Sequence, residues 1–202
     1  MTAASTTVAT DENIDLLIII ASTRPGRVGL PVGEWITGIA EAHGGFNVRV
    51  ADLATINLPF MNEPVHPVKK QYMFDHTKAW SETVEAADAF LFVMPEYNHS
   101  MTAPLKNAID YLSQEWGYKP VGFVSYGGVS GGLRAVQQVK QAVAALKMTA
   151  VSEAVTIPSV TSFVHDGFFA PEERLASAAS TMLGQLRRWA IALEPIRNGE
   201  IA

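Results

Sequence analysis

The chain has 202 residues, of which 48% are hydrophobic and 17% are charged, a composition typical of a single globular domain rather than of a disordered chain. Its net charge of −5 provides no basic surface, so nucleic acid is not an expected partner. The absence of cysteine excludes disulfides, thiol nucleophiles and cysteine-ligated metal centres, so any redox activity must come from a bound cofactor.

Residues 1–12 are rich in threonine and alanine and lack the basic and apolar segments of a signal peptide. We expect them to form a disordered N-terminus ahead of one domain over residues 13–196. The apolar run 16–21 is too short to cross a bilayer, so no membrane partner is expected and the predicted location is the cytoplasm.

Apolar runs typical of strands recur along the chain, near residues 14–21, 47–52, 88–94, 120–126 and 151–156. Several are continuously apolar, as parallel strands buried on both faces are. Helical spacing of apolar residues follows four of the runs, near residues 32–39, 105–112, 133–146 and 175–193. This alternation predicts an α/β fold, namely a flavodoxin-like, doubly wound, five-stranded parallel sheet of order 2-1-3-4-5 in a three-layer α/β/α arrangement.

The stretch 59–75 is irregular and long for a connection in a compact domain, and long ordered loops are often functional. It is expected to be either a lid or a subunit contact. His66 and His76 lie in or beside it, but without the spacing of a metal-binding motif, so no metal site is predicted.

The first strand ends in a loop of hydroxyl, basic and glycine residues that leads into a helix: Ser22, Thr23, Arg24, Pro25, Gly26, Arg27, Val28 and Gly29. The N–H groups and positive dipole end of a helix N-terminus suit a phosphate, and arginines add charge and bidentate hydrogen bonds. The loop matches neither the nucleoside-triphosphate nor the dinucleotide glycine motif, so a monophosphate fits better. A plain turn with two solvated arginines is the alternative.

The third strand stops at a proline, which is followed by polar and aromatic residues: Pro95, Glu96, Tyr97 and Asn98. Tyr97 can stack on a flat ring, and Glu96 and Asn98 can meet the polar edge of a heteroaromatic system. Ligands of open parallel sheets bind outside the carboxyl ends of the strands. One loop suited to an anion and one suited to a ring therefore suggest a flavin nucleotide.

The fourth strand runs into a third such loop, Ser125, Tyr126, Gly127 and Gly128, with two more glycines at 131 and 132. This density of glycine indicates a backbone pressed close to a ligand or a tight turn with positive φ. An esterase elbow is not favoured, because the serine within 128–132 is out of register with G-x-S-x-G.

Together these residues resemble the NADPH-dependent FMN reductases, flavodoxin-like flavoproteins that include quinone, azo-dye and chromate reductases. The similar segments are the phosphate loop 22–29, the signature block 95–110 and the third flavin loop 125–128, within a resemblance over roughly 14–190. Ala21 stands where many members have glycine, and Arg27 replaces a serine of one branch. The phosphate is therefore expected to be held more by charge than by hydroxyls.

The resemblance implies FMN as cofactor and NADPH or NADH as co-substrate. The FMN phosphate would be held by Ser22, Arg24, Arg27, Val28 and Gly29. The ring system would be held by Pro95, Glu96, Tyr97 and Asn98. The flavin or its ribityl chain would be bordered by Ser125, Tyr126, Gly127 and Gly128.

The function expected on this basis is hydride transfer from NAD(P)H to the flavin and onward reduction of a small-molecule acceptor: free FMN, a quinone, an azo compound or a metal oxyanion. The flavin performs the chemistry, so no catalytic side chain is predicted. A flavodoxin-type electron carrier is the alternative, disfavoured by the two arginines and the modest net charge. A homodimer or homotetramer is expected by resemblance.

Overall fold

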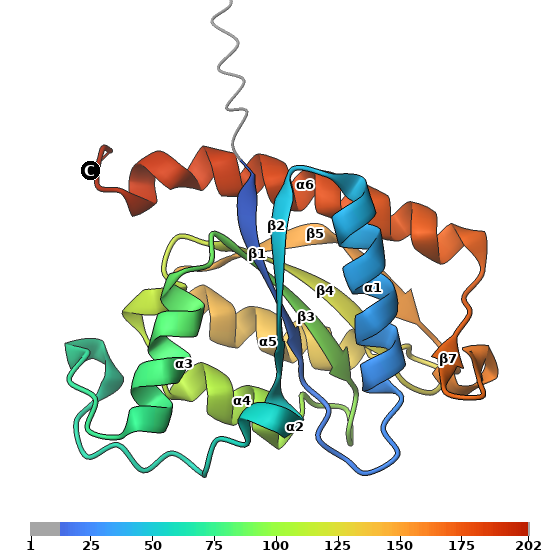
Figure 1. The fold of residues 1–202 in the computed structure, drawn as a ribbon, viewed down its shortest axis with the longest axis horizontal. Coiled ribbons are helices and arrows are strands. Elements are labelled where there is room, and N and C mark those ends of the chain that lie inside the picture. Colours follow the sequence, from blue (N-terminus) through green and yellow to red (C-terminus); the bar gives the residue numbers. More distant parts are fainter. Residues whose placement is uncertain (1–12, 202) are drawn as a thin grey trace, which may run out of the picture.

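The computed structural model describes residues 13–201, so the prediction made for residues 1–12 lies outside the described residues. At its centre is one parallel sheet of order β2-β1-β3-β4-β5 (Figure 1). The strands are β1 (Ile14–Ile20), β2 (Phe46–Asp52), β3 (Ala89–Pro95), β4 (Pro120–Tyr126) and β5 (Thr149–Ile157). The predicted fold and strand order are confirmed.

Helices cover both faces of the sheet (Figure 1). Helices α1 (Gly29–His43) and α6 (Glu173–Arg197) pack on one face. Helices α3 (Asp75–Glu85), α4 (Ala103–Asp110) and α5 (Leu133–Ala145) pack on the other. The shorter elements are α2 (Leu53–Ile56), the 3-10 turns η1 (Pro67–Lys69), η2 (Gln114–Trp116) and η3 (Val160–Phe163), and the hairpin of β6 (Val164–His165) and β7 (Phe168–Phe169).

The burial of the strands explains their sequences. Strands β3 and β4 are buried along their whole length, and alternate residues of β1 join the cores on opposite faces. A strand covered on both faces has no solvent side on which polar residues would be favoured, so it is continuously apolar. The edge strands β2 and β5 include exposed residues, and their sequences are correspondingly mixed.

The structure contains elements that the sequence did not predict, among them α2, α3 and the β6–β7 hairpin. Helix α3 lies between β2 and β3, where no helical spacing had been identified, because two of its four buried residues, Thr77 and Ser81, are polar. The β6–β7 hairpin was also missed, since strands of two residues carry no recognisable alternation. Within residues 13–201, no helix is both long and apolar enough to cross a membrane.

Candidate flavin-nucleotide site

The loops that leave β1, β3, β4 and β5 meet at the carboxyl edge of the sheet and line one pocket of about 400 Å³. The residues that line it are Ser22, Arg24, Gly26, Arg27, Val28, Pro95, Glu96, Tyr97, Tyr126, Gly127, Gly128, Ser159, Val160 and Thr161. The three loops identified in the sequence are thus brought together.

Three of the predicted residues do not line the pocket, and two of them pack or bond behind it. Gly29 is the buried first residue of α1, and a Cβ added there would lie 2.3 Å from Tyr126 Oη. The buried Ser125 hydroxyl donates to the Gly131 carbonyl at 2.9 Å and so braces the glycine loop. Asn98 lies at an exposed turn beyond Tyr97.

Sequence reasoning missed the contribution of the loop after β5, where Ser159, Val160 and Thr161 complete one wall. The signal was present, since Pro158 follows a predicted strand just as Pro95 ends another. The rule that ligands bind at the carboxyl ends of parallel strands applies to this loop as well.

The phosphate end of the pocket is formed by the β1–α1 loop. Within residues 13–201, no side chain caps the N-terminus of α1, whose N-cap residue Val28 lines the pocket, so its first N–H groups lack a side-chain acceptor. Ser22 is buried, and its Oγ lies 3.4 Å from Tyr97 Oη. Arg24 is exposed and makes no side-chain hydrogen bond or ion pair within residues 13–201. This end of the pocket can therefore accept an anion.

In contrast to Arg24, Arg27 is paired with other residues of the protein. Its guanidinium forms a two-pronged pair with Asp52, at 2.6 Å and 2.5 Å, and also donates to the Ser22 carbonyl at 2.6 Å. The hydrogen bond from Arg27 holds the pKa of Asp52 below its usual value, despite the opposing effect of burial. Asp52 also accepts from the Ala54 N–H and so caps α2. Arg27 thus ties the phosphate loop to the end of β2.

Glu96 anchors the ring loop to the glycine loop. Its carboxylate accepts hydrogen bonds from Ser130 Oγ at 2.9 Å, from Arg134 Nε at 2.6 Å and from the Arg134 N–H at 3.1 Å. Burial alone would raise the pKa of Glu96, but the hydrogen bonds from Arg134 and Ser130 outweigh it and lower the pKa. The Glu96 side chain therefore fixes the end of β3 relative to α5. Both of its carboxylate oxygens accept hydrogen bonds from within the protein.

Tyr97 stands at the mouth of the pocket on a tight turn. Its N–H and carbonyl exchange hydrogen bonds with those of Ser100 at 3.0 Å and 2.9 Å, and Asn98 and His99 both have positive φ, of 50° and 66°. This is the pattern of a type I′ turn. The turn holds the Tyr97 ring, which is 39% exposed, at the entrance.

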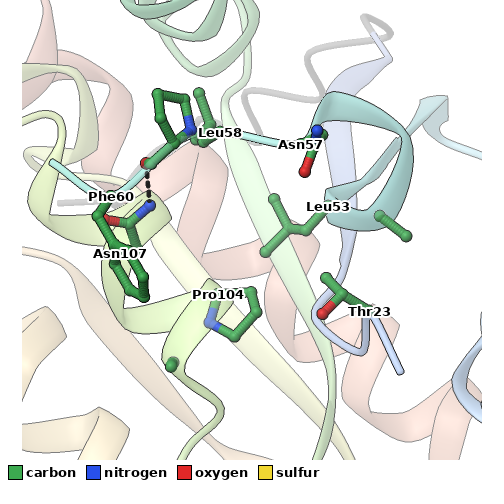
Figure 2. A pocket seen from close by; sticks show the side chains of 10 residues that line it. Thr23, Leu53, Asn57, Leu58, Phe60, Pro104 and Asn107 are labelled. Carbon is green, nitrogen blue, oxygen red and sulfur yellow. Dashed lines mark hydrogen bonds between the residues drawn. The ribbon is translucent and has the colours of Figure 1, made fainter. Parts of the chain in front are cut away.

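A second pocket of about 450 Å³ lies on the other side of the phosphate loop, between α2 and α4 (Figure 2). Thr23, Leu53, Phe60 and Pro104 are among the residues that face it (Figure 2). Asn107 donates to the Pro59 carbonyl at 2.7 Å and accepts from the Met61 N–H at 2.9 Å. These bonds hold the start of the 59–75 stretch against α4, where it forms a fixed wall.

The two histidines of this region are used in local contacts. His66 accepts from the Val68 N–H and caps η1, while His76 stacks on Phe74 and contacts Asn62. Within the described part of the chain, no three His, Asp or Glu side chains are arranged as metal ligands.

The fold and the pocket define a flavodoxin-like α/β protein with a nucleotide-sized site at the carboxyl edge of its sheet. The family model of the NADPH-dependent FMN reductases matches residues 14–162. The chain therefore belongs to the NADPH-dependent FMN reductase family, as the resemblance implied, and the predicted class of oxidoreductase is confirmed.

Individual relatives agree with this assignment. An NAD(P)H-dependent FMN reductase of Nectria sp is 34% identical over 175 residues, which cover 81% of this chain and 87% of the relative. One of Schizosaccharomyces pombe is 36% identical over 148 residues, 72% of each chain. The flavoenzyme NAD(P)H:(acceptor) oxidoreductase FerB of Paracoccus denitrificans shares the fold, with a TM-score of 0.70 at 21% identity over 89% of this chain and 98% of FerB.

Proposed function

We propose that this protein is an FMN-dependent NAD(P)H oxidoreductase that reduces a small-molecule acceptor. The observation that carries the proposal is the pocket in which the uncapped N-terminus of α1 and Arg24 lie together with the half-exposed ring of Tyr97. Such a pocket suits a ligand with a phosphate at one end and a flat ring at the other. The residues present fit FMN.

The residues that would hold the FMN phosphate are Ser22 and Arg24 through their side chains, Val28 and Gly29 through their backbone, and Arg27, whose charge lies beside this end. The ring would lie against Pro95, Glu96 and Tyr97, and the ribityl chain would run past Tyr126, Gly127 and Gly128, while Asn98 and Ser125 would act only through the turns that they form. Ser159, Val160 and Thr161 are added from the structure.

Bound FMN would supply the chemistry, accepting a hydride from NAD(P)H and passing electrons to the acceptor. The chain's own residues position the nucleotide and close its surroundings. Among the described residues, Glu96 is the one carboxylate that lines this pocket, and it is engaged with Arg134 and Ser130. A role in proton transfer is therefore not assigned to it.

The acceptor proposed is free FMN, a quinone, an azo compound or a metal oxyanion, and relatives named for two of these chemistries match the chain. They are an NAD(P)H:quinone oxidoreductase of Solanum tuberosum, 39% identical over 100 residues, and an NADPH azoreductase of a Bacillus strain, 32% identical over 124 residues. These cover 50% and 66% of the relatives, so the acceptor itself is part of the proposal.

We also propose that the protein forms a homodimer or homotetramer in which the 59–75 stretch takes part. Phe60 is 84% exposed, and Met73 is 61% exposed on the same stretch. Asn107 fixes the backbone on either side of Phe60 to α4, and the Met73 N–H donates to the Glu63 carboxylate, so both apolar side chains are carried on a hydrogen-bonded backbone. Sedimentation velocity measures the oligomeric state.

The cytoplasmic location stays a prediction.

We expect NADPH to reduce the FMN-loaded protein and a second substrate to reoxidise it. Anaerobic mixing with NADPH should bleach the visible flavin band, and added quinone should restore it. Because both substrates would use the same pocket in turn, double-reciprocal plots should be parallel. A flavodoxin-type carrier would instead show no bleaching by NADPH, and that result would contradict the proposal.

Replacing Arg24 with glutamine should weaken FMN binding by about 10- to 150-fold, the range for one hydrogen bond to a charged group. Riboflavin, which lacks the phosphate, should bind the variant and the wild type equally. The control is Arg174→Gln, which removes an exposed arginine paired with Glu172 on the surface. Fluorescence titration measures both affinities, and unchanged FMN affinity would remove Arg24 from the site.

A further inference from the structure

One buried polar atom in this pocket has no partner. Tyr126, the last residue of β4, is 3% exposed, and its hydroxyl makes no hydrogen bond within residues 13–201. Ser22 is close by, but its Oγ is in contact with Tyr97 Oη at 3.4 Å. An unpaired buried hydroxyl destabilises a folded protein, and phenylalanine would fill the same space without that penalty.

The hydroxyl lies at the phosphate end of the pocket, beside Ser22 and the first residue of α1. A Cβ added to Gly29 would be 2.3 Å from Tyr126 Oη and 2.9 Å from Ser22 Cβ. Tyr126 therefore reaches across from β4 to the first residue of α1. Position 29 must be glycine to leave room for the hydroxyl in this place.

The surroundings of the hydroxyl favour an anionic partner. The α1 N-terminus has no side-chain cap and no acidic residue in its first turn, so its positive dipole end is uncompensated. Burial raises the pKa of Tyr126, although neighbouring Ser22 and Arg27 oppose the rise. The hydroxyl thus stays protonated and can donate one hydrogen bond.

We propose that the Tyr126 hydroxyl donates a hydrogen bond to the phosphate group of the bound flavin nucleotide. This assigns Tyr126 to recognition of the phosphate instead of the ribityl chain, and it rests on the proposed function. The phosphate would then be bound by two segments far apart in the sequence, the loop after β1 and the end of β4. The specificity for FMN over riboflavin would depend on both.

The test is Tyr126→Phe, which removes the hydroxyl alone, with Tyr118→Phe as a matched control at a half-exposed tyrosine that lines a different pocket. In the Tyr126 variant, FMN should bind about tenfold more weakly, while riboflavin binds as to the wild type. The melting temperature without flavin should be equal or higher, because an unpaired polar group is gone. Inorganic phosphate should raise the wild-type melting temperature more than that of the variant.

Unchanged FMN affinity in Tyr126→Phe would overturn the inference. Equal weakening of FMN and riboflavin would also overturn it, because the tyrosine would then act on the ring or through packing. Failure of the proposed function has a different signature, since wild-type protein would bind neither flavin. In that case a phosphate-dependent rise in melting temperature that the variant lacks would still assign the hydroxyl to an anion site.

Discussion

Gly132→Ala is expected to destabilise the protein by about 2–5 kcal/mol, combining a left-handed backbone with a steric clash, and to abolish flavin binding. Gly132 has a φ of +87°, which glycine adopts readily and alanine does not. Its added Cβ would lie 2.8 Å from the backbone nitrogen of Tyr126 and 2.8 Å from Ser125 Cβ. Backbone atoms of a central strand cannot move aside, so the whole loop must shift.

The matched control is Gly38→Ala on α1, where an added Cβ meets nothing within 4 Å. Alanine is the better helix former, so this variant should gain up to about 1 kcal/mol and keep its flavin affinity. Urea unfolding measures the stabilities, and fluorescence titration measures FMN binding. Wild-type stability and affinity in Gly132→Ala would show that this loop is not a fixed part of the site.

Glu115→Ala is expected to cost about 3 kcal/mol or more, because three donors lose their acceptor. Glu115 is 1% exposed and accepts from Tyr72 Oη at 2.7 Å, from Ser81 Oγ at 2.7 Å and from the Ser113 N–H at 3.1 Å. Tyr72 belongs to the 59–75 stretch, so the carboxylate also fixes the end of that stretch to α3. Glu115→Gln keeps an acceptor oxygen and should cost about half as much. Equal stability of all three proteins would contradict this role.

The stability lost in Glu115→Gln should depend on pH. Burial alone would raise the pKa of Glu115, but the hydrogen bonds from Tyr72 and Ser81 outweigh it and hold the pKa below its ordinary value of 4.5. A lowered pKa in the folded state means that the stabilisation is complete above pH 4.5 and is lost as the pH falls through the folded-state pKa. The difference in unfolding free energy between wild type and variant should therefore narrow below pH 4.5. A difference in unfolding free energy that grows as the pH falls would contradict this prediction.

Much of the fold could be predicted because the relevant signals are local. The strands β1, β3 and β4 are buried on both faces, so their sequences are predominantly apolar runs. Helix α3 could not be recognised in the same way. Ser81 is buried because it donates to Glu115, 34 residues away, and no local pattern indicates that a polar residue has such a partner.

At the site, too, local patterns predict where the loops lie but not which distant residues pair with their side chains. The loops after β1, β3 and β4 could be located, because in a parallel sheet every carboxyl end reaches the same edge. What the charged residues do there depends on distant partners. Arg27 is paired with Asp52, 25 residues on, and Glu96 with Arg134, 38 residues on. The sequence predicts both side chains as ligand contacts, and no local pattern indicates that each also braces its loop against a neighbouring element.

The central claim is that these loops together bind one FMN by its phosphate and its ring. Titrating purified, flavin-free protein with FMN and following flavin fluorescence tests it most directly. We expect saturation at one FMN per chain with submicromolar affinity, and weaker binding of riboflavin. Fluorescence that shows no saturable change through the micromolar range would contradict it.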